Sequence, residues 1–358
     1  RFPIAIKTWR TEMNKTENEN EAILKQDKHS KVSVLNPKSM EEIFDLVYQN
    51  RRPIVKGMIY AGAYLFVGAP KIGKSYFMMQ LAYHVSMGIS LWGYEVKKAT
   101  VLYLALEDDN RRIQQRLYQM FGVQDVSDNL FFSTEKIALS GQLENEIELF
   151  LKSIGKQADI IDTLQKVRGT ESDTLSYAKD YDTVGKLKEI ADRNDVCIMV
   201  VHHTRKQQSD DAFDMISGTN GLMGAADCSM ILHKEKRTSN KAILDITGRD
   251  QTDQRIYLKR DEERLIWQFE KSESELWKEK PDPLLEVIAD FINSNNGEWS
   301  GTPTELAKIL AGDIQPNALS MMLNVRAGKL FEEYQICYEK GRNHSGRYIK
   351  LFLCEKKA

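Results

Sequence analysis

The chain has 358 residues and a formal net charge of −2, with 42% hydrophobic and 28% charged residues. These values are ordinary for a soluble globular protein of about two domains, and they exclude a chain that is basic overall. Any nucleic-acid contact must therefore come from local patches. The four cysteines are scattered without a C-x-x-C spacing, which argues against a zinc site or a disulfide framework and fits a reducing cytosol.

No apolar run reaches transmembrane length, and no stretch has the three-part design of a signal peptide. We therefore expect a cytoplasmic protein without a membrane partner. Residues 1–38 are polar with few apolar anchors, and they are predicted to be a disordered or remnant tail in which Met13 resembles an initiator. After the tail we expect an α/β domain over 39–270, a linker over 271–283 and a small domain over 284–358.

The α/β domain is predicted from its alternation of apolar runs and helical stretches, which is typical of a parallel sheet covered by helices. A first helix is expected after the N-cap Ser39. The expected strands cover 63–67, 101–106, 160–162, 196–201, 230–232 and 242–246, with 255–258 and 265–267 as closing antiparallel strands. The expected helices cover 76–82, 111–121, 147–154 and 181–194.

The motif that organises this domain is G-x-x-x-x-G-K-S, which runs from Gly68 to Ser75 between a predicted strand and a predicted helix. Unsatisfied backbone N–H groups and the positive end of the helix dipole would point there at an anion. Lys74 would reach the β- and γ-phosphates of ATP, and the Ser75 hydroxyl would hold Mg²⁺. Lys71 is either a solvated loop charge or a second phosphate contact. The predicted ATP-binding residues are Gly68, Ala69, Pro70, Lys71, Ile72, Gly73, Lys74, Ser75 and Tyr76.

Carboxylates stand at the ends of two further predicted strands, where an ATPase needs a metal ligand and a group that activates water. Glu107 is the candidate for orienting water; Asp108 and Asp109 compete with it, although Asp109 also fits a helix cap. Asp162 is assigned the second Mg²⁺ ligand, the Walker B role, with a capping or turn aspartate as the alternative. The apolar run before Asp162 is short for a buried central strand.

Two histidines and one arginine complete the set of candidates. His202 and His203 end a third strand, where one of them would sense the γ-phosphate or contact DNA; the alternative is a histidine that is simply satisfied at a strand end. Arg249 follows another strand and could act as an arginine finger on a neighbouring subunit. The alternative for Arg249 is a surface arginine paired with Asp250 or Asp253.

Two other classes of nucleotide enzyme are disfavoured. A GTPase should carry an Asn/Thr-Lys-x-Asp guanine reader, and the sequence has none. A metabolite kinase should carry a lid rich in arginine. Arg111, Arg112 and Arg116 are the candidates for such a lid, and we interpret them as one solvated helix face.

With these motifs in place, the chain resembles the RepA-type hexameric helicases of mobilisable plasmids, within the RecA-like P-loop ATPases of the AAA family. The matching pieces are Gly68–Ser75, Leu102–Asp108, Ile160–Arg168, Val200–Lys206, Phe213–Asp227 and Asp245–Gln251. The resemblance covers about residues 39–270. It implies ATP hydrolysis in a ring, with Lys74, Ser75, Glu107 and Asp162 acting within one subunit, and a DNA-contacting loop over 206–224.

The small domain lies outside this resemblance. Three expected helices, over 284–292, from 302 to 310 and from 316 to 325, precede a hairpin over 335–353, which is a winged-helix pattern. Its second half is basic and could present a strip of phosphate-facing side chains, the alternative being a winged helix that contacts protein. The strip consists of Arg326, Lys329, Lys340, Arg342, Arg347 and Lys350.

Two functional hypotheses follow from the sequence. The first is a motor that hydrolyses ATP in a hexameric homo-oligomeric ring and moves on single-stranded DNA, with a primase or an initiator protein as a possible partner. The second is a regulator whose winged helix binds duplex DNA while ATP only switches its oligomeric state. The presence of water-positioning, metal-binding and finger candidates favours the first.

Overall fold

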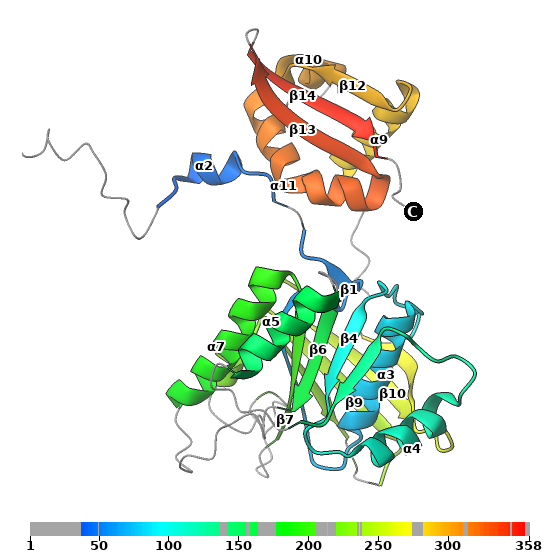
Figure 1. Ribbon diagram of the computed structural model, residues 1–358. Helices are drawn as coiled ribbons and strands as arrows, with labels where there is room; N and C mark the ends of the chain where they lie inside the picture. Colours follow the sequence, from blue (N-terminus) through cyan, green and yellow to red (C-terminus); the bar gives the residue numbers. More distant parts are fainter. Residues whose placement is uncertain are drawn as a thin grey trace, which may run out of the picture. The chain divides into compact units, whose positions relative to one another are not determined.

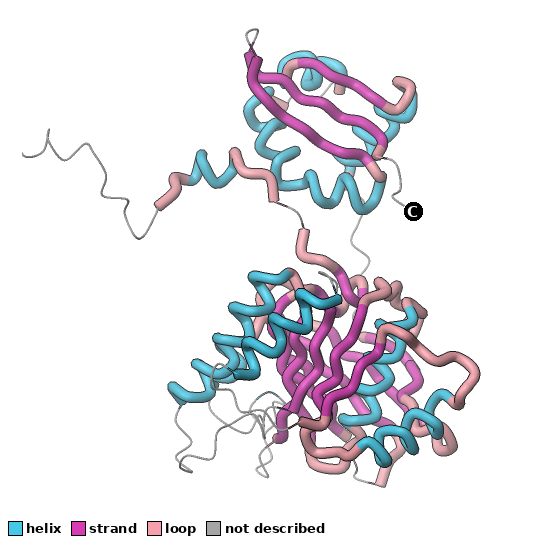
Figure 2. Tube along the Cα trace, viewed as in Figure 1, coloured by secondary structure: helices cyan, strands magenta, loops and turns pink. Residues whose placement is uncertain are grey.

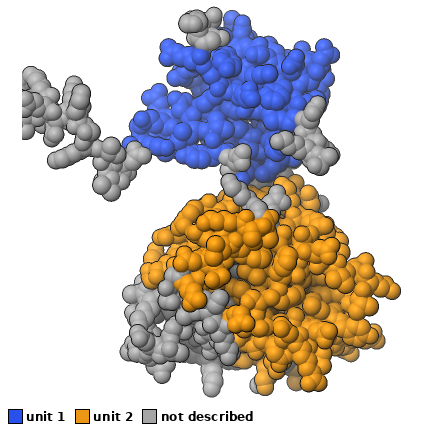
Figure 3. All heavy atoms as spheres, viewed as in Figure 1, with its two compact units in different colours: residues 1–50, 282–358 blue, residues 51–281 orange. Residues whose placement is uncertain are grey.

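The computed structural model describes residues 37–48, 50–135, 142–154, 158–163, 177–204, 213, 220–234, 236, 238–273, 282–310, 314–343 and 346–354. The chain divides into two compact units, coloured separately in Figure 3. The first combines Arg1–Asn50 with Asp282–Ala358, and the second is Arg51–Pro281. The predicted tail and most of the predicted linker and DNA-contacting loop lie outside the described residues.

The second unit is built on a nine-stranded sheet in the order β11-β10-β9-β8-β3-β7-β6-β4-β5. The strands from β8 to β5 are parallel, whereas β9, β10 and β11 join by antiparallel pairing. The predicted parallel sheet with two closing antiparallel strands is therefore corrected to a mixed sheet in which β9 is antiparallel as well. These three consecutive strands return by short connections instead of helical crossovers. The strands are β3 (Gly62–Gly68), β4 (Thr100–Leu104), β5 (Leu130–Ser133), β6 (Ala158–Thr163), β7 (Cys197–His203), β8 (Cys228–His233), β9 (Lys241–Gly248), β10 (Gln254–Arg260) and β11 (Trp267–Ser272).

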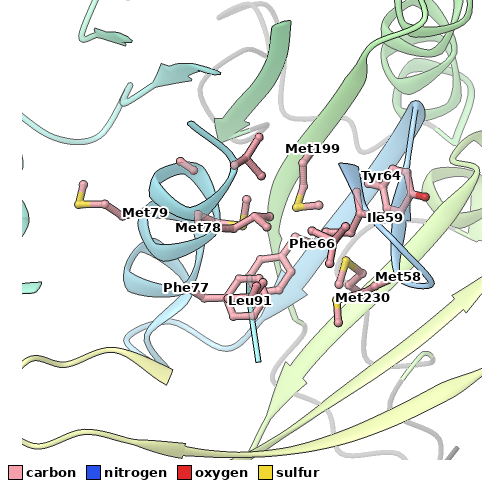
Figure 4. Packing of buried hydrophobic residues seen from close by; sticks show 14 of the residues in the cluster. Met58, Ile59, Tyr64, Phe66, Phe77, Met78, Met79, Leu91, Met199 and Met230 are labelled. Atoms are coloured by element: carbon pink, nitrogen blue, oxygen red, sulfur yellow. The ribbon is translucent and has the colours of Figure 1, made fainter. Parts of the chain in front are cut away.

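Helices cover both faces of this sheet (Figures 1 and 2). They are α3 (Lys74–Met87), α4 (Asn110–Phe121), α5 (Gln142–Ile154), α7 (Tyr177–Asn194) and α8 (Asn220–Ala225), and a short ribbon of β1 (Pro53–Val55) and β2 (Ile59–Tyr60) precedes β3. Alternate residues of β3 enter different cores: Phe66 packs with α3 and α4, and Leu65 packs with α5, α7 and α8. Phe66 stacks on Phe77 of α3 at 4.6 Å between ring centroids (Figure 4), which packs the start of α3 against β3.

Two strands differ from their predicted extents. β6 runs for six residues, because Ala158 and Asp159 extend the ladder with β4 ahead of the apolar run, so the strand before Asp162 has ordinary length. The strand predicted at 265–267 begins only at Trp267, because Leu265 has a φ of 58° and belongs to the preceding turn.

The first unit places three helices against a three-stranded antiparallel sheet in the order β12-β14-β13. Its elements are α9 (Pro283–Ser294), β12 (Glu298–Gly301), α10 (Pro303–Ile309), α11 (Pro316–Tyr334), β13 (Ile336–Asn343) and β14 (Gly346–Leu353), preceded in the chain by α2 (Met40–Phe44). Strand β12 was not expected from the sequence. The sequence analysis assigned residues 39–50 to the α/β domain, whereas α2 lies in this unit, because buried Asn324 donates to the Phe44 carbonyl at 2.8 Å.

Cysteine pairing also differs from expectation in the first unit. Cys337 and Cys354 are joined by a disulfide, with their Cα atoms 5.8 Å apart. The sequence argued against a disulfide framework, but antiparallel β13 and β14 bring the two distant cysteines together. Cys197 and Cys228 of the second unit are buried and free.

Candidate functional site

The phosphate loop occupies the carboxyl end of β3, at the switch from strand to helix that the sequence predicted. Its two glycines are required by the geometry. A Cβ on Gly68 would lie 2.7 Å from the Leu232 carbonyl oxygen, and Gly73 has a φ of 111°. No side chain caps α3 at Gly73, so the first N–H groups of the helix are available to an anion. This cradle fits the phosphates of a nucleotide.

Lys74 is the first residue of α3, and its side chain is turned into the loop. Its ammonium donates to the carbonyl oxygens of Gly68 at 2.6 Å and Ala69 at 3.1 Å. The side chain is only 7% exposed, and burial lowers the pKa of Lys74 to about 8, with the charge of Glu107 acting in the opposite direction. Lys74 therefore lies at the loop as a buried cation suited to a phosphate.

His203, and not His202, is the histidine that meets Lys74. The register pairs His203 with Gly68 across β3 and β7, and its Nδ1 lies 3.0 Å from the Lys74 ammonium. Burial first and the Lys74 charge second lower the pKa of His203, although Glu107 and a Gly68 backbone hydrogen bond oppose them. A neutral imidazole that accepts from Lys74 satisfies this arrangement. His202 is buried one position back in the strand, against Val67.

The three carboxylates after β4 have different surroundings. Asp109 caps α4 by accepting from the Arg112 N–H at 2.8 Å. Asp108 accepts from the guanidiniums of Arg112, at 3.0 Å, and Arg116. Glu107 is exposed, and its charge acts on both Lys74 and His203. Of the three candidates, Glu107 is thus the one whose charge acts on the residues of the phosphate-loop site.

The metal-binding candidates come from two elements of this edge. Ser75 lies in the first turn of α3, half-buried. Asp162 lies in β6, where it pairs with Val200 of β7 one residue before the strand ends. β6 is separated from β3 by β7 alone, so both residues stand on the same edge of the sheet. A serine hydroxyl and a carboxylate are oxygen donors of the kind that Mg²⁺ prefers, so the donor set fits the ion.

A cluster of aromatic and arginine side chains contacts Gly73 and Tyr76, and it was not predicted from the sequence. Trp267 is fully buried, and its indole N–H donates to the Gly73 carbonyl at 3.3 Å while Gln80 holds its backbone. Arg260 lies 4.4 Å from the centroid of the Tyr76 ring, and Arg116 lies 5.4 Å from it. Arg116 is thus not on a solvated face as predicted, since only 17% of its side chain is exposed. No local pattern links Trp267 to the loop; the connection depends on strand β11.

Arg249 lies at the other edge of the sheet. Gly248 pairs with Cys228, and Cys228 pairs with Tyr64 near the start of β3, which is about 13 Å of strand away from Gly68. The Arg249 guanidinium donates to the Gly224 carbonyl at the end of α8. Asp250 and Asp253 are both described, and neither forms an ion pair with it. The structure therefore does not bring Arg249 together with its own chain's phosphate loop.

Comparisons with known proteins find one family model and solved structures that are similar to this chain. The family model of an AAA domain matches residues 33–209, just under half of the chain. A solved structure of a DnaB-like replicative helicase, described with its interactions with primase, is similar over 74% of each chain, with 14% identity and a TM-score of 0.50. A KaiC-like protein from Pyrococcus horikoshii aligns over 63% of this chain and all of its own, with 12% identity and a TM-score of 0.44. A search of curated proteins found no match.

The unit from Arg51 to Pro281 is a mixed α/β domain with a phosphate loop after β3. Its fold is similar to that of the DnaB-like replicative helicase, and the AAA domain model matches its first part. Among the helices that the structure describes, none is long and apolar enough to cross a membrane.

Proposed function

We propose that this protein is an ATP-dependent DNA motor, a RepA-type replicative helicase of a plasmid or other mobile element. It would hydrolyse ATP between the subunits of a hexameric ring and move on single-stranded DNA. The observation that carries the proposal is the division of the site between the two edges of the sheet. Lys74, His203 and Glu107 gather at one edge, and Arg249 lies at the other.

Under this proposal, a finger at Arg249 requires a second subunit. An arginine finger stabilises the charge on the transferring phosphoryl group only by direct contact. Arg249 therefore serves a neighbour's nucleotide, through a head-to-tail interface of the kind that closes into a ring. Within one subunit, Lys74 binds the phosphates of ATP, Ser75 and Asp162 hold Mg²⁺, Glu107 orients the attacking water and His203 senses the γ-phosphate. Bound Mg²⁺ would neutralise charge on the phosphate oxygens.

A mixing experiment tests the arrangement. Arg249→Ala and Glu107→Gln subunits are each expected to hydrolyse ATP at least a hundredfold more slowly than wild type in the presence of single-stranded DNA. In a mixture, some interfaces pair an intact Glu107 with a neighbour's intact Arg249, so activity should return. Arg264→Ala, an exposed arginine in the turn before β11, is the matched control and should retain activity. If wild type shows neither DNA-stimulated hydrolysis nor strand displacement at low salt, the motor proposal fails.

The regulator is the second candidate, and the element order of the first unit favours it. Three helices, with strand β12 after the first and a hairpin after the third, follow the plan expected of a winged helix. In this alternative the winged helix binds one duplex sequence and ATP switches the oligomeric state. A footprint on specific duplex that persists in a Lys74→Met variant would favour the regulator. Contact with a primase or an initiator belongs to the motor proposal.

A further inference from the structure

The basic side chains of the first unit fall into two groups in the structure. Those on α11 are neutralised: Arg326 lies 3.0 Å from the Asp282 carboxylate, and Lys329 lies 3.8 Å from Glu333. The continuous basic strip that the sequence suggested across α11 and the hairpin is therefore interrupted at the helix. The unpaired positive charge must be sought on the hairpin.

The exposed side of α11 is apolar rather than basic. Met322, Val325 and Phe331 expose 37%, 59% and 46% of their surface. A recognition helix reads the major groove with polar and basic side chains. These residues do not provide such side chains, so α11 is a poor reader of DNA sequence.

On the hairpin of β13 and β14, Lys340 lies 3.9 Å from the Asp45 carboxylate, which leaves Arg342 and Arg347 near the turn. Arg342 and Arg347 are both exposed and stand directly opposite each other in the ladder, one pair before the turn. Across the part of the chain that the structure describes, neither guanidinium meets a carboxylate. Like charges directly opposite on a sheet repel each other, so this pair favours an anion between or beside the two guanidiniums. The end of the hairpin lies at the edge of its unit (Figure 1).

Two neighbouring side chains of β14 lie on the other face of the hairpin, because successive residues of a strand alternate between faces. Lys350 stands directly opposite Glu339 in the ladder, and its ammonium lies 4.7 Å from the centroid of the Phe352 ring, so it does not join the arginine pair. Tyr348 stands between Arg347 and Lys350 and is 36% exposed. Its ring lies over Gly341, where a Cβ would meet the Tyr348 hydroxyl at 2.5 Å. One face of that ring is thus covered, which leaves little of it for stacking a nucleobase.

We propose that the end of the β13–β14 hairpin, with Arg342 and Arg347, binds the phosphate backbone of duplex DNA without reading its sequence. Duplex DNA presents a dense array of phosphates, and a two-stranded ribbon fits its grooves. Single-strand binding depends on exposed aromatic stacking platforms, and the exposed ring near the end of this hairpin, that of Tyr348, has one face covered by Gly341. This activity goes beyond the motor proposal, because it would hold duplex DNA independently of the ATP site.

The test measures binding of the full chain to a blunt duplex and to oligo-dT by fluorescence anisotropy over a range of salt. Arg342→Gln/Arg347→Gln should weaken duplex binding at least tenfold and reduce the slope of log affinity against log salt by about 2. Binding to oligo-dT and the ATPase rate should stay within twofold of wild type. The matched control, Lys308→Gln/Lys329→Gln, removes two charges from α10 and α11 and should leave duplex binding unchanged.

Three outcomes would overturn the proposal. Equal losses in the hairpin variant and its control would mean that net charge alone matters. An equal loss on oligo-dT would place the hairpin on the single-strand path. No duplex binding by wild type at low salt would mean that the hairpin does not bind DNA, and an acidic protein surface would then be its partner. A wild-type protein without ATPase activity would count against the motor proposal but not against this one. Thermal unfolding of each variant checks that its fold is intact.

Discussion

Lys74, the predicted phosphate-binding lysine, is expected to lower the free energy of unfolding of the nucleotide-free protein. The residue is 7% exposed, and its ammonium is held by two carbonyl oxygens and one neutral imidazole. No full negative charge contacts it, because Glu107 acts only through space. A buried cation without a direct counter-charge favours its neutral form, and ATP phosphates would supply the missing charge.

The magnitude follows from the shift in pKa. Burial lowers the pKa of Lys74 from 10.5 to about 8, which at about 1.4 kcal/mol per unit corresponds to about 3 kcal/mol. Below pH 8 Lys74 is protonated in both the folded and the unfolded chain, so the full cost of burying its charge is present. Between pH 8 and 10.5 the unfolded chain binds more protons than the folded one, so the stability of wild type rises. Lys74→Met removes the charge, but it leaves two carbonyl groups with fewer donors, so we expect a gain of about 1–3 kcal/mol at pH 7.

Urea unfolding of nucleotide-free protein measures this gain, and Lys71→Met is the matched control. Lys71 is exposed on the same loop, so its substitution should change stability by less than about 0.5 kcal/mol. The advantage of Lys74→Met should shrink as the pH rises toward 10. ATP should stabilise wild type and not Lys74→Met. A Lys74→Met variant that is less stable than wild type at pH 7, or whose advantage does not vary with pH, would refute the reasoning.

Three further predictions concern the same edge of the sheet. Glu107→Gln should retain ATP binding and lose hydrolysis by about a hundredfold or more, as measured by calorimetry and phosphate release; equal loss of binding would count against a water-orienting role. Trp267→Phe should weaken ATP binding about two- to tenfold by freeing the Gly73 carbonyl, whereas Trp92→Phe, which removes an indole hydrogen bond to the Trp267 carbonyl instead, should only lower the melting temperature. Gly68→Ala should cost about 2 kcal/mol or more in urea unfolding, because its Cβ would overlap a backbone carbonyl of β8; wild-type stability would contradict that contact.

The phosphate loop and its setting could be predicted because their causes are local. A buried apolar run, two glycines and an uninterrupted helical stretch specify strand, loop and helix within a short segment, and β3 and α3 follow. The cap at Asp109 was also foreseen as one alternative, since capping depends on a residue three positions away. Which histidine meets Lys74 could not be foreseen, because that depends on the register between β3 and β7.

The features that were missed depend on pairing between distant strands. Strand β6 is longer than its apolar run because backbone hydrogen bonding in a ladder tolerates a polar residue such as Asp159. Trp267 reaches Gly73 across 194 residues because β11 closes the sheet beside α3. The pairing of Cys337 with Cys354 is different, since it lies at the predicted hairpin and depends on the register of β13 and β14. Sequence periodicity identifies the faces of strands but does not specify their neighbours.

The position of Arg249 shows how strand direction connects fold to mechanism. Had β9 been parallel to β8, as expected for a strand ahead of the closing antiparallel pair, the residue after it would stand at the same edge of the sheet as the phosphate loop. Because β9 is antiparallel, the same residue emerges at the opposite edge, where the Asp227 carbonyl accepts from its N–H at 2.9 Å. One reversal of direction thus separates the finger candidate from Lys74. Under the motor proposal, this separation makes hydrolysis a property of the interface between two subunits and not of the single chain.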